Sequence, residues 1–427
     1  MKKTIKILLI DDSKTILNAL ESEIFRCIAG KCVHNFEILK AETFTEASKI
    51  IRKEHKDIYV AVVDLNLPDC KSGQAVLLTS THKIPTIVLS TVDNDDVKAL
   101  LLKKDVLDYT KKDSMNSIEY VSNFVKKVLR NYETTALVVD DSKVSRNAFR
   151  TDLEKLRINV LEAEDGKEAL AIMDNPDNNI SLILTDYNMP NMDGVELTIK
   201  LRQKYDKDVL SIIALSASEE LNILSDFIKE GANDFISKPH KFEELNVRVH
   251  SNLDTLELFK QTKDLANKDF LTGSYNRRYF FESSKAILNK NQRKDKEVAV
   301  ATLDIDLFKN VNDTYGHDVG DVAIQEIAII LDKTLRTSDL VARFGGEEYC
   351  ILLEDISLED TKHLFEKIRS NFENNEIKVD DISLKYTVSL GIAYGKSIDI
   401  NALLKVSDEA LYEAKDTGRN KVIIHNI

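Results

Sequence analysis

Basic residues are in the minority in this sequence. The 427 residues include 59 Lys and Arg against 72 Asp and Glu, which gives a formal net charge of −13. A protein that binds nucleic acid regardless of sequence needs basic patches that displace counterions. We therefore expect no nucleic-acid partner, although a local basic site for a phosphorylated small molecule stays open.

Cysteine is also scarce. The four cysteines are scattered and none forms a Cys-x-x-Cys pair; they are Cys27, Cys32, Cys70 and Cys350. This pattern argues against a disulfide scaffold and against a zinc site, and it is typical of a protein that works in the reducing cytoplasm.

Long apolar runs are absent as well. No run approaches the ~20 residues that a membrane-spanning helix needs, so we expect no membrane span. Lys6 interrupts the apolar start of the chain and Asp11 ends it, which favours a first β-strand over a signal peptide. An apolar content of 43% with 31% charged residues is typical of a packed soluble protein, and the length suggests about three domains of roughly 150 residues each.

The first half of the chain contains an internal repeat. ILLIDDSKTILNAL at residue 7 returns as ALVVDDSKVSRNAF at 136, and AVVDLNLPDCKSG at 61 returns as LILTDYNMPNMDG at 182. Each unit alternates short β-branched runs with longer amphipathic stretches. That alternation predicts a parallel sheet covered by helices on both faces.

Polar residues follow the predicted strands of both units in the same order. The first unit has Asp11, Asp12, Asp64, Ser90 and Lys112, and the second has Asp140, Asp141, Asp186, Ser216 and Lys238. Open α/β sheets bind ligands at the carboxyl ends of their strands. Three carboxylates in one crevice repel each other unless a cation joins them, and Mg²⁺ suits such an all-oxygen site. Helix capping would explain one such residue, but not five types in matching order twice.

Both units resemble response-regulator receiver domains, over roughly residues 4–130 (the first repeat) and 134–253 (the second repeat); we place the domain boundaries at 1–131 and 132–253. The resemblance implies a flavodoxin-like, doubly wound fold. It implies phosphorylation of Asp64 and Asp186 by a histidine kinase or a phosphotransfer protein. It also implies Mg²⁺ on the three acids and on the backbone carbonyls of Asn66 and Asn188, with a switch formed by Ser90 and Lys112 or by Ser216 and Lys238.

The second repeat fits this family better than the first. In the first repeat KKDVLD replaces the usual Gly-Ala start, Asp113 stands where proline is expected, and extra residues surround CIAGKCVHNF. The acid pocket is nevertheless complete. One of the two repeats could therefore be an adaptor for dimerisation rather than a phosphorylation target.

A helical stripe follows the second repeat. Apolar residues from Phe242 to Phe259 recur every three or four positions without a breaker. We expect the last helix of the second repeat to continue to about residue 267, with a helical linker over 254–268. This helix is either an ordinary packed helix or a lever between domains, through a helix pair in a dimer.

The composition changes from Asp269 onward. VAVATLDID at 298 predicts a strand that ends in acids, and DLVARF with EEYCILL predicts a hairpin whose loop is Gly345-Gly346. Adjacent strands would bring Asp304 and Glu347 together at one edge of a sheet, where Mg²⁺ and nucleotide phosphates would offset their repulsion. The two glycines would let a nucleotide lie against the backbone.

Other polar side chains in this region suit a guanine nucleotide. Lys309 can neutralise phosphate charge, and Asn312 and Asp321 can hydrogen-bond to guanine. Lys415 and Arg419, one helical turn apart, can grip terminal phosphates.

DFLTGSYNRR, DIDLFKNVNDTYGHDVGD, GGEEY and EAKDTGRN stand in the order typical of diguanylate cyclase (GGDEF) domains, and residues 269–427 (the C-terminal domain) resemble that family. The resemblance implies an α/β domain with a mixed central sheet like that of nucleotide cyclases. It implies metal ligation by Asp304, the Ile305 carbonyl and Glu347, with Glu348 in support. It also makes Glu347 the base and Lys309 a stabiliser of the transition state. Tyr349 and Ser274 replace the commoner Phe and Leu.

The two resemblances together imply a response regulator that converts two GTP into cyclic di-GMP as a homodimer, with Mg²⁺ or alternatively Mn²⁺. Arg336 and Asp339 match the RxxD site at which the product inhibits such enzymes. An inactive scaffold that binds GTP or cyclic di-GMP is the alternative. Because Asp304, Lys309, Glu347 and Glu348 are all present, we favour the enzyme.

Overall fold

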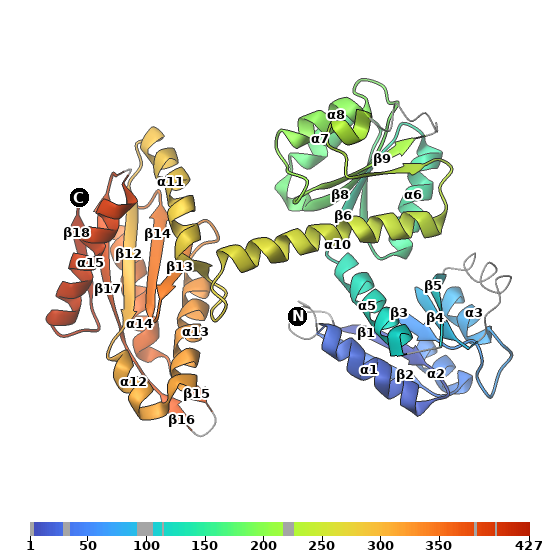
Figure 1. The fold of residues 1–427 in the computed structure, drawn as a ribbon, viewed down its shortest axis with the longest axis horizontal. Coiled ribbons are helices and arrows are strands. Elements are labelled where there is room, and N and C mark those ends of the chain that lie inside the picture. The colour runs from blue at the N-terminus through green and yellow to red at the C-terminus, as the bar shows by residue number, and fades with distance from the viewer. Residues whose placement is uncertain are drawn as a thin grey trace. The chain divides into compact units, whose positions relative to one another are not determined.

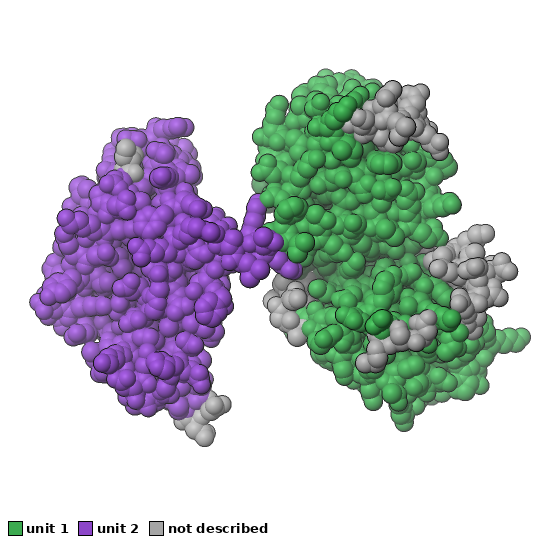
Figure 2. Space-filling view, in the orientation of Figure 1, with its two compact units in different colours: residues 1–260 green, residues 261–427 purple. Residues whose placement is uncertain are grey.

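The computed structural model describes residues 4–28, 35–91, 106–112, 115–216, 226–379, 382–397 and 399–427. The chain forms two compact units, Met1–Lys260 and Gln261–Ile427, which Figure 2 colours separately. The first unit contains both repeats and the second contains the C-terminal domain. Among the described helices, none is both long enough and apolar enough to cross a bilayer.

The first repeat is a parallel five-stranded sheet in the order β2-β1-β3-β4-β5 (Figure 1). Its strands are β1 (Ile5–Ile10), β2 (Phe36–Ala41), β3 (Ile58–Val63), β4 (Thr86–Ser90) and β5 (Val106–Lys111). Its described helices are α1 (Lys14–Ile28), α2 (Phe44–Glu54), α3 (Gln74–Thr81) and α5 (Met115–Asn131). Strand side chains alternate between two cores: Ile7 and Leu9 lie in the core with α1 and α5, whereas Leu8 and Ile10 lie in the core with α2 and α3.

The second repeat has the same topology, with the sheet order β10-β9-β8-β6-β7. Its strands are β6 (Thr135–Val139), β7 (Asn159–Ala163), β8 (Ile180–Asp186), β9 (Ser211–Ser216) and β10 (Asp234–Ser237). Its helices with described bounds are α6 (Lys143–Lys155), α7 (Gly166–Met173), α8 (Gly194–Arg202) and α10 (Phe242–Asn267), with a 3₁₀ turn at Pro176–Asn178. The fold class predicted for the repeats is therefore confirmed.

One hydrophobic core joins the two repeats. It contains side chains of α1 and α5 together with side chains of α6 and α10. At its border, Arg130 Nη1 lies 2.7 Å from Asp254 Oδ1 and Lys127 Nζ lies 2.7 Å from Asp254 Oδ2. Asn131 Nδ2 lies 3.1 Å from Nε2 of the buried His250. The repeats thus form one unit rather than two separately packed ones.

The last helix of the second repeat continues past the repeat. α10 runs without interruption from Phe242 to Asn267, as the apolar stripe predicts. Its buried side chains are confined to the part of the helix up to Leu253; they are Leu245, Asn246, Val249, His250 and Leu253.

The C-terminal domain is a six-stranded mixed sheet in the order β11-β13-β14-β12-β17-β18, with helices on both faces (Figure 1). The strands are β11 (Tyr275–Asn276), β12 (Val298–Ile305), β13 (Leu340–Gly345), β14 (Glu348–Glu354), β17 (Val388–Gly395) and β18 (Val422–Asn426), and β15 (Ile377–Val379) pairs with β16 (Ile382–Leu384). α12 (Phe308–Tyr315), α13 (His317–Thr334) and α14 (Leu358–Asn374) cover one face, and α11 (Arg277–Arg293) and α15 (Ile400–Asp416) cover the other. The central strand β12 runs antiparallel to both neighbours, so the mixed sheet that the sequence predicts is confirmed.

Candidate functional site

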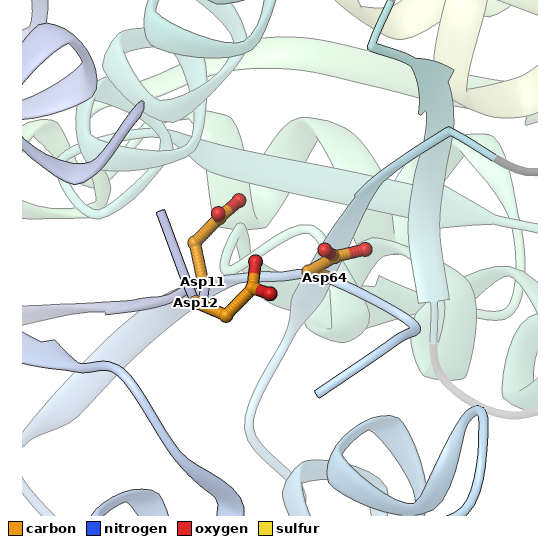
Figure 3. Close-up of side chains that lie close together, drawn as sticks. All are labelled: Asp11, Asp12 and Asp64. Carbon is orange, nitrogen blue, oxygen red and sulfur yellow. The ribbon is translucent and has the colours of Figure 1, made fainter. Parts of the chain in front are cut away.

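Three carboxylates meet at the carboxyl end of the first sheet. Asp11 and Asp12 follow β1 and Asp64 follows β3, and one oxygen of each lies within 4.8 Å of the others (Figure 3). Lys112, which follows β5, places Nζ 2.6 Å from Asp11 Oδ2 and 2.7 Å from Asp64 Oδ2. The fold therefore brings these four side chains together, as the sequence predicts.

Burial sets the electrostatics of this pocket. It raises the pKa of the Asp11 carboxyl above its usual range, against the opposing effect of the Lys112 ammonium and with a small addition from Asp64. Burial by itself would lower the pKa of Lys112, but the hydrogen bonds to the two carboxylates outweigh it and raise that pKa. A cation would relieve the repulsion among the acids, and the donors are all oxygens, so the pocket fits Mg²⁺.

The second repeat contains the same pocket with one extra donor. Asp140, Asp141 and Asp186 each have an oxygen within 4.8 Å of the others. Lys238 bonds to both Asp140 and Asp186, with 2.6 Å between Nζ and Asp186 Oδ1, and Ser145 Oγ donates to Asp140 at 2.6 Å. Burial raises the pKa of Asp186, opposed by Lys238 and increased by Asp140.

The predicted switch and carbonyl positions lie at the rims of these pockets. Ser90 and Ser216 are the last residues of β4 and β9 and are buried. Asn66 and Asn188 are exposed, each two residues past the central aspartate. Asp113, the departure noted in the first repeat, lies outside the described residues.

Asp304 is the most buried acid of the C-terminal candidate site. It is the seventh residue of β12 and 6% exposed, and Lys415 Nζ from the last turn of α15 lies 2.7 Å from its Oδ1. Burial raises the pKa of Asp304; Lys415 lowers it, and the charges of Glu347 and Glu348 raise it further. The acids thus act on one another at one sheet edge, as predicted, and Lys415 already neutralises part of their charge.

The hairpin register differs from the prediction. Gly345 is the last residue of β13 and pairs with Glu348, so the two-residue loop is Gly346-Glu347 rather than Gly345-Gly346. Glu347 therefore lies in the loop and does not begin β14. The cause is a register irregularity between Arg343 and Gly345. Both glycines have positive φ, 149° and 54°, and a Cβ on either would meet open space, which leaves room for a ligand against this backbone.

Arg343 supports this loop, a role that no sequence motif predicts. Its Nε donates to the Gly346 carbonyl at 2.8 Å, and its Nη1 lies 2.8 Å from Asp269 Oδ1. Asp269 also accepts from the Thr272 N–H and hydroxyl, at 3.1 and 2.9 Å. The opposing charge of Arg343 and these hydrogen bonds outweigh burial and hold the pKa of Asp269 below its ordinary value.

Asp306 was also missed. It is buried and accepts from Ser389 Oγ, Thr387 Oγ1 and the Asn420 N–H at 2.6, 2.7 and 2.9 Å. The signal for it is its place two residues after Asp304, just past the end of β12. Asp304 bonds to Lys415 on α15, and Asp306 bonds to the N–H of Asn420 after α15.

The predicted guanine and phosphate contacts lie on α12, on α13, and at or just after the end of α15. Lys309 is exposed on α12, and Asp321 is exposed on α13. Asn312 on α12 has a buried Oδ1 without a partner among the described residues, and a Cβ at position 320 would come within 2.0 Å of that atom. Gly320 thus makes room for the Asn312 side chain between the two helices.

Arg419 lies elsewhere than predicted. α15 ends at Asp416, so Arg419 is not one helical turn beyond Lys415 but in the following turn, with φ of 62°. Gly418, with φ of 122°, marks the end of the helix. Arg419 is exposed, and its backbone N–H donates to the Ala414 carbonyl at 3.0 Å.

Arg336 and Asp339 form a tight turn between α13 and β13. Asp339 N donates to the Arg336 carbonyl at 3.0 Å, and Arg336 N donates to Asp339 Oδ2 at 2.9 Å. The Arg336 side chain is exposed, and both residues line a cavity of about 450 Å³ with Lys268, Tyr275 and Asp332. Burial raises the pKa of Asp339, opposed by the hydrogen bond from Arg336 N.

Two stretches of the chain match known families. Residues 136–250 match the response regulator receiver domain, and residues 266–421 match the family described as diguanylate cyclase, GGDEF domain.

Individual relatives match parts of the chain. The response regulator PleD of Caulobacter vibrioides is 29% identical over 298 residues, which are 67% of this chain and 65% of PleD. The probable diguanylate cyclase DgcT of Escherichia coli is 38% identical over 42% of each chain. A solved structure of a probable two-component system response regulator/GGDEF domain protein is 36% identical with a TM-score of 0.51, over 59% of this chain and 99% of that one. The chain thus spans just under two thirds of PleD and less than half of DgcT.

Proposed function

Because the chain belongs to the response regulators that carry a C-terminal GGDEF domain, we propose that it converts two GTP into cyclic di-GMP and two pyrophosphates. The observation that carries the proposal is the group at the end of β12. A buried aspartate paired with Lys415 stands beside the acids of an open glycine turn. That group lies inside the stretch that matches the GGDEF family.

A divalent metal fits the acids of this site. Asp304, Glu347 and the Ile305 carbonyl offer only oxygen ligands. Burial, with a further contribution from Glu347 and Glu348, raises the pKa of Asp304, and a cation would offset both effects. Mg²⁺ is the proposed ion, with Mn²⁺ as the alternative. When bound, it would neutralise charge on the phosphates of GTP.

Side chains of this domain would transfer the proton, stabilise the developing charge and bind the nucleotide. Glu347, in the loop, would accept the proton of a 3′-hydroxyl, and Lys309 would face the charge that develops on the phosphates. The 3′-oxygen of one GTP forms a bond to the α-phosphorus of the other, and the bond to pyrophosphate breaks. Lys415 and Arg419 would hold the terminal phosphates, and Asn312 and Asp321 would hydrogen-bond to guanine.

Two such domains must face each other, because each holds one GTP and the product contains two new bonds. We therefore propose a homodimer as the active form. Phosphorylation of a receiver would raise activity by favouring that dimer.

We also propose that the first repeat is a receiver like the second. It has the same sheet order, and Lys112 bridges Asp11 and Asp64 as Lys238 bridges Asp140 and Asp186. Asp64 and Asp186 are the proposed phosphoryl acceptors, and a histidine kinase or phosphotransfer protein is the proposed donor. The turn of Arg336 and Asp339 is the proposed site of product inhibition.

The test is a turnover assay on the full chain with GTP and Mg²⁺, with and without beryllofluoride as a phosphoryl mimic, alongside sizing chromatography. We expect cyclic di-GMP, more of it with beryllofluoride, and a dimer in the activated sample. Glu347→Gln should remove the product while leaving GTP binding. Binding of GTP without turnover under activating conditions would instead favour a non-catalytic scaffold.

A further inference from the structure

We propose that Asp306 is a positioning residue that fixes the Arg419–Asn420 turn and thereby holds Arg419 for the triphosphate. The inference rests on the proposed function, in which Arg419 contacts phosphate. Asp306 itself would touch neither the nucleotide nor a metal.

The contacts of Asp306 point away from a role as a metal ligand. Its Oδ1 accepts from Ser389 Oγ at 2.6 Å, and its Oδ2 accepts from Thr387 Oγ1 at 2.7 Å and from the Asn420 N–H at 2.9 Å. Asp306 is 7% exposed, so these donors replace water around a buried carboxylate. The Asp306 N–H also donates to the Thr387 carbonyl at 2.9 Å. Asp306 is thus bound by Thr387 before β17, by Ser389 on β17 and by Asn420 after α15.

The turn that Asp306 holds needs outside support. Arg419 and Asn420 both have left-handed backbone, with φ of 62° and 49°, a conformation that costs non-glycine residues free energy. The Asn420 side chain provides a second attachment, since its Oδ1 accepts from Arg369 Nη1 at 2.7 Å and its Nδ2 donates to Glu373 Oε1 at 2.9 Å. Asp306 holds the backbone of the turn, and α14 holds its side chain.

The end of β12 therefore fixes both proposed phosphate contacts. Asp304 pairs with Lys415 at 2.7 Å, and two residues later Asp306 binds the N–H that follows Arg419. Both acids therefore bond to the end of α15 or to the segment that follows it. The spacing between the Lys415 ammonium and the Arg419 backbone is thereby tied to the strand that carries the proposed metal ligand.

A positioning role and a merely stabilising role give different results. If Asp306 only stabilises the domain, its loss lowers stability and affects every ligand alike. If it positions Arg419, its loss weakens the part of the affinity that comes from the β- and γ-phosphates. The affinity for GMP, which lacks these phosphates, should then stay the same.

The experiment compares the full chain with Asp306→Asn, Asp306→Ala, Asn420→Gly and Arg419→Ala. Asn420→Gly keeps the N–H and suits the positive φ, but it removes the attachment to α14. Thr361→Val is the matched control, because it removes a buried polar group on α14 whose hydroxyl donates to the carbonyl of Ser357, the N-cap of the same helix. Dissociation constants for a non-hydrolysable GTP analogue and for GMP are measured by calorimetry, and kcat and KM where turnover remains.

We expect Asp306→Ala to weaken binding of the GTP analogue by about tenfold, in line with the loss of one charge-assisted phosphate contact, and to leave GMP binding unchanged. Arg419→Ala should have the same selectivity, Asp306→Asn and Asn420→Gly a smaller loss, and Thr361→Val none. KM should rise more than kcat falls.

An unchanged ratio of the two dissociation constants in folded Asp306→Ala, or in both milder variants if that one does not fold, overturns the proposal. If Arg419→Ala is selective and the Asp306 variants are not, the fault lies in the role of Asp306. A wild-type chain that binds neither ligand overturns the proposed function and this inference with it.

Discussion

Lys415 Nζ lies 2.7 Å from Asp304 Oδ1, so the buried acid of the candidate active site is paired before any nucleotide arrives. Lys415 offsets only part of the unfavourable environment of Asp304, because burial together with Glu347 and Glu348 keeps its pKa above the ordinary value of 3.8. The site without ligand therefore holds surplus negative charge. That charge favours a cation, and it also opposes folding.

The first prediction concerns this conflict between stability and function. Because the folded-state pKa of Asp304 is raised, its contribution to stability is full below pH 3.8 and is lost as the pH rises through the folded pKa. At neutral pH, Asp304→Asn should therefore raise the Tm of the C-terminal domain without ligand by about 2–4 °C, which corresponds to roughly 1 kcal/mol, while removing turnover. Scanning calorimetry without metal tests this.

Lys415→Met is the matched variant for that prediction. It removes the only cation paired with Asp304 among the described residues and should lower the same Tm. Mg²⁺ should raise the Tm of the wild type and not that of Asp304→Asn. If both substitutions lower the Tm equally, the surplus charge at Asp304 is not destabilising.

The second prediction concerns the support of the Gly346-Glu347 loop. Arg343 ties the Gly346 carbonyl to Asp269, so its loss should release the loop that carries Glu347. We expect Arg343→Lys to lower kcat by about 10²-fold through misplacement of that group, with little change in KM. Asp269→Asn should act in the same direction.

Arg277→Gln is the control, because Arg277 lies over the rings of Phe281 and Phe344 rather than on the loop. Steady-state kinetics with GTP separate the two parameters. A rise in KM alone for Arg343→Lys would mean that Arg343 serves binding rather than the placement of the loop.

The sheets and their strand-end chemistry follow from local patterns. Continuous apolar strands and a repeated order of Asp, Ser and Lys suffice to predict that Lys112 and Asp64 meet, because parallel strands end at the same edge. The same reasoning predicts α10, whose apolar stripe runs through to Asn267.

What the sequence leaves open depends on register and on distant partners. The loop Gly346-Glu347 lies one residue later than the predicted loop. The shift comes from an irregularity in strand register between Arg343 and Gly345, which no residue pattern predicts. Asp306 accepts hydrogen bonds from Thr387 and Asn420, which are 81 and 114 positions away in the sequence. Arg343 donates to Asp269, which is 74 positions away. Such pairings depend on the tertiary fold, so the short motif around each residue does not reveal them.

The third prediction concerns His250, which is 4% exposed between the two repeats. Burial, followed by the charges of Arg130 and Lys127, lowers its pKa from 6.5 to about 3. The folded state therefore keeps His250 neutral. Its contribution to stability is full above pH 6.5 and is lost as the pH falls from 6.5 toward 3. At pH 5 the loss should reach about 2 kcal/mol.

His250→Gln keeps an acceptor for Asn131 Nδ2 and should flatten this pH dependence. Exchange-mass spectrometry of peptides from α5 and α10, in urea at pH 5 to 8, gives the stability of this region. His363→Gln is the control, since the His363 side chain is 78% exposed. A slope that His250→Gln leaves unchanged would assign the pH dependence to other groups.

The fourth prediction concerns the two proposed phosphoryl acceptors, Asp64 and Asp186. Both pockets pair their central aspartate with a lysine, at 2.7 Å for Asp64 and 2.6 Å for Asp186, so we expect acetyl phosphate to label both repeats. Mass spectrometry with Mg²⁺ should show one label lost in Asp64→Asn, the other in Asp186→Asn, and both in the double variant. A label that Asp64→Asn does not reduce would make the first repeat an adaptor, and no label at all would refute both acceptors.

The last prediction concerns product inhibition at the turn between α13 and β13. The Arg336 guanidinium is exposed beside Asp339, and the hydrogen bonds that close this turn use the Arg336 backbone. Arg336→Ala should therefore preserve the turn and remove one charged contact to the product. Loss of one such contact corresponds to an increase of about tenfold in the cyclic di-GMP concentration that halves the rate.

Initial rates of Arg336→Ala without added product should match the wild type. Lys333→Ala is the control, because it removes an exposed charge from the last turn of α13, and its initial rates should also match the wild type. If inhibition is as strong in Arg336→Ala as in the wild type, the product acts through another surface or by competing with GTP at the turn of Gly345 and Gly346.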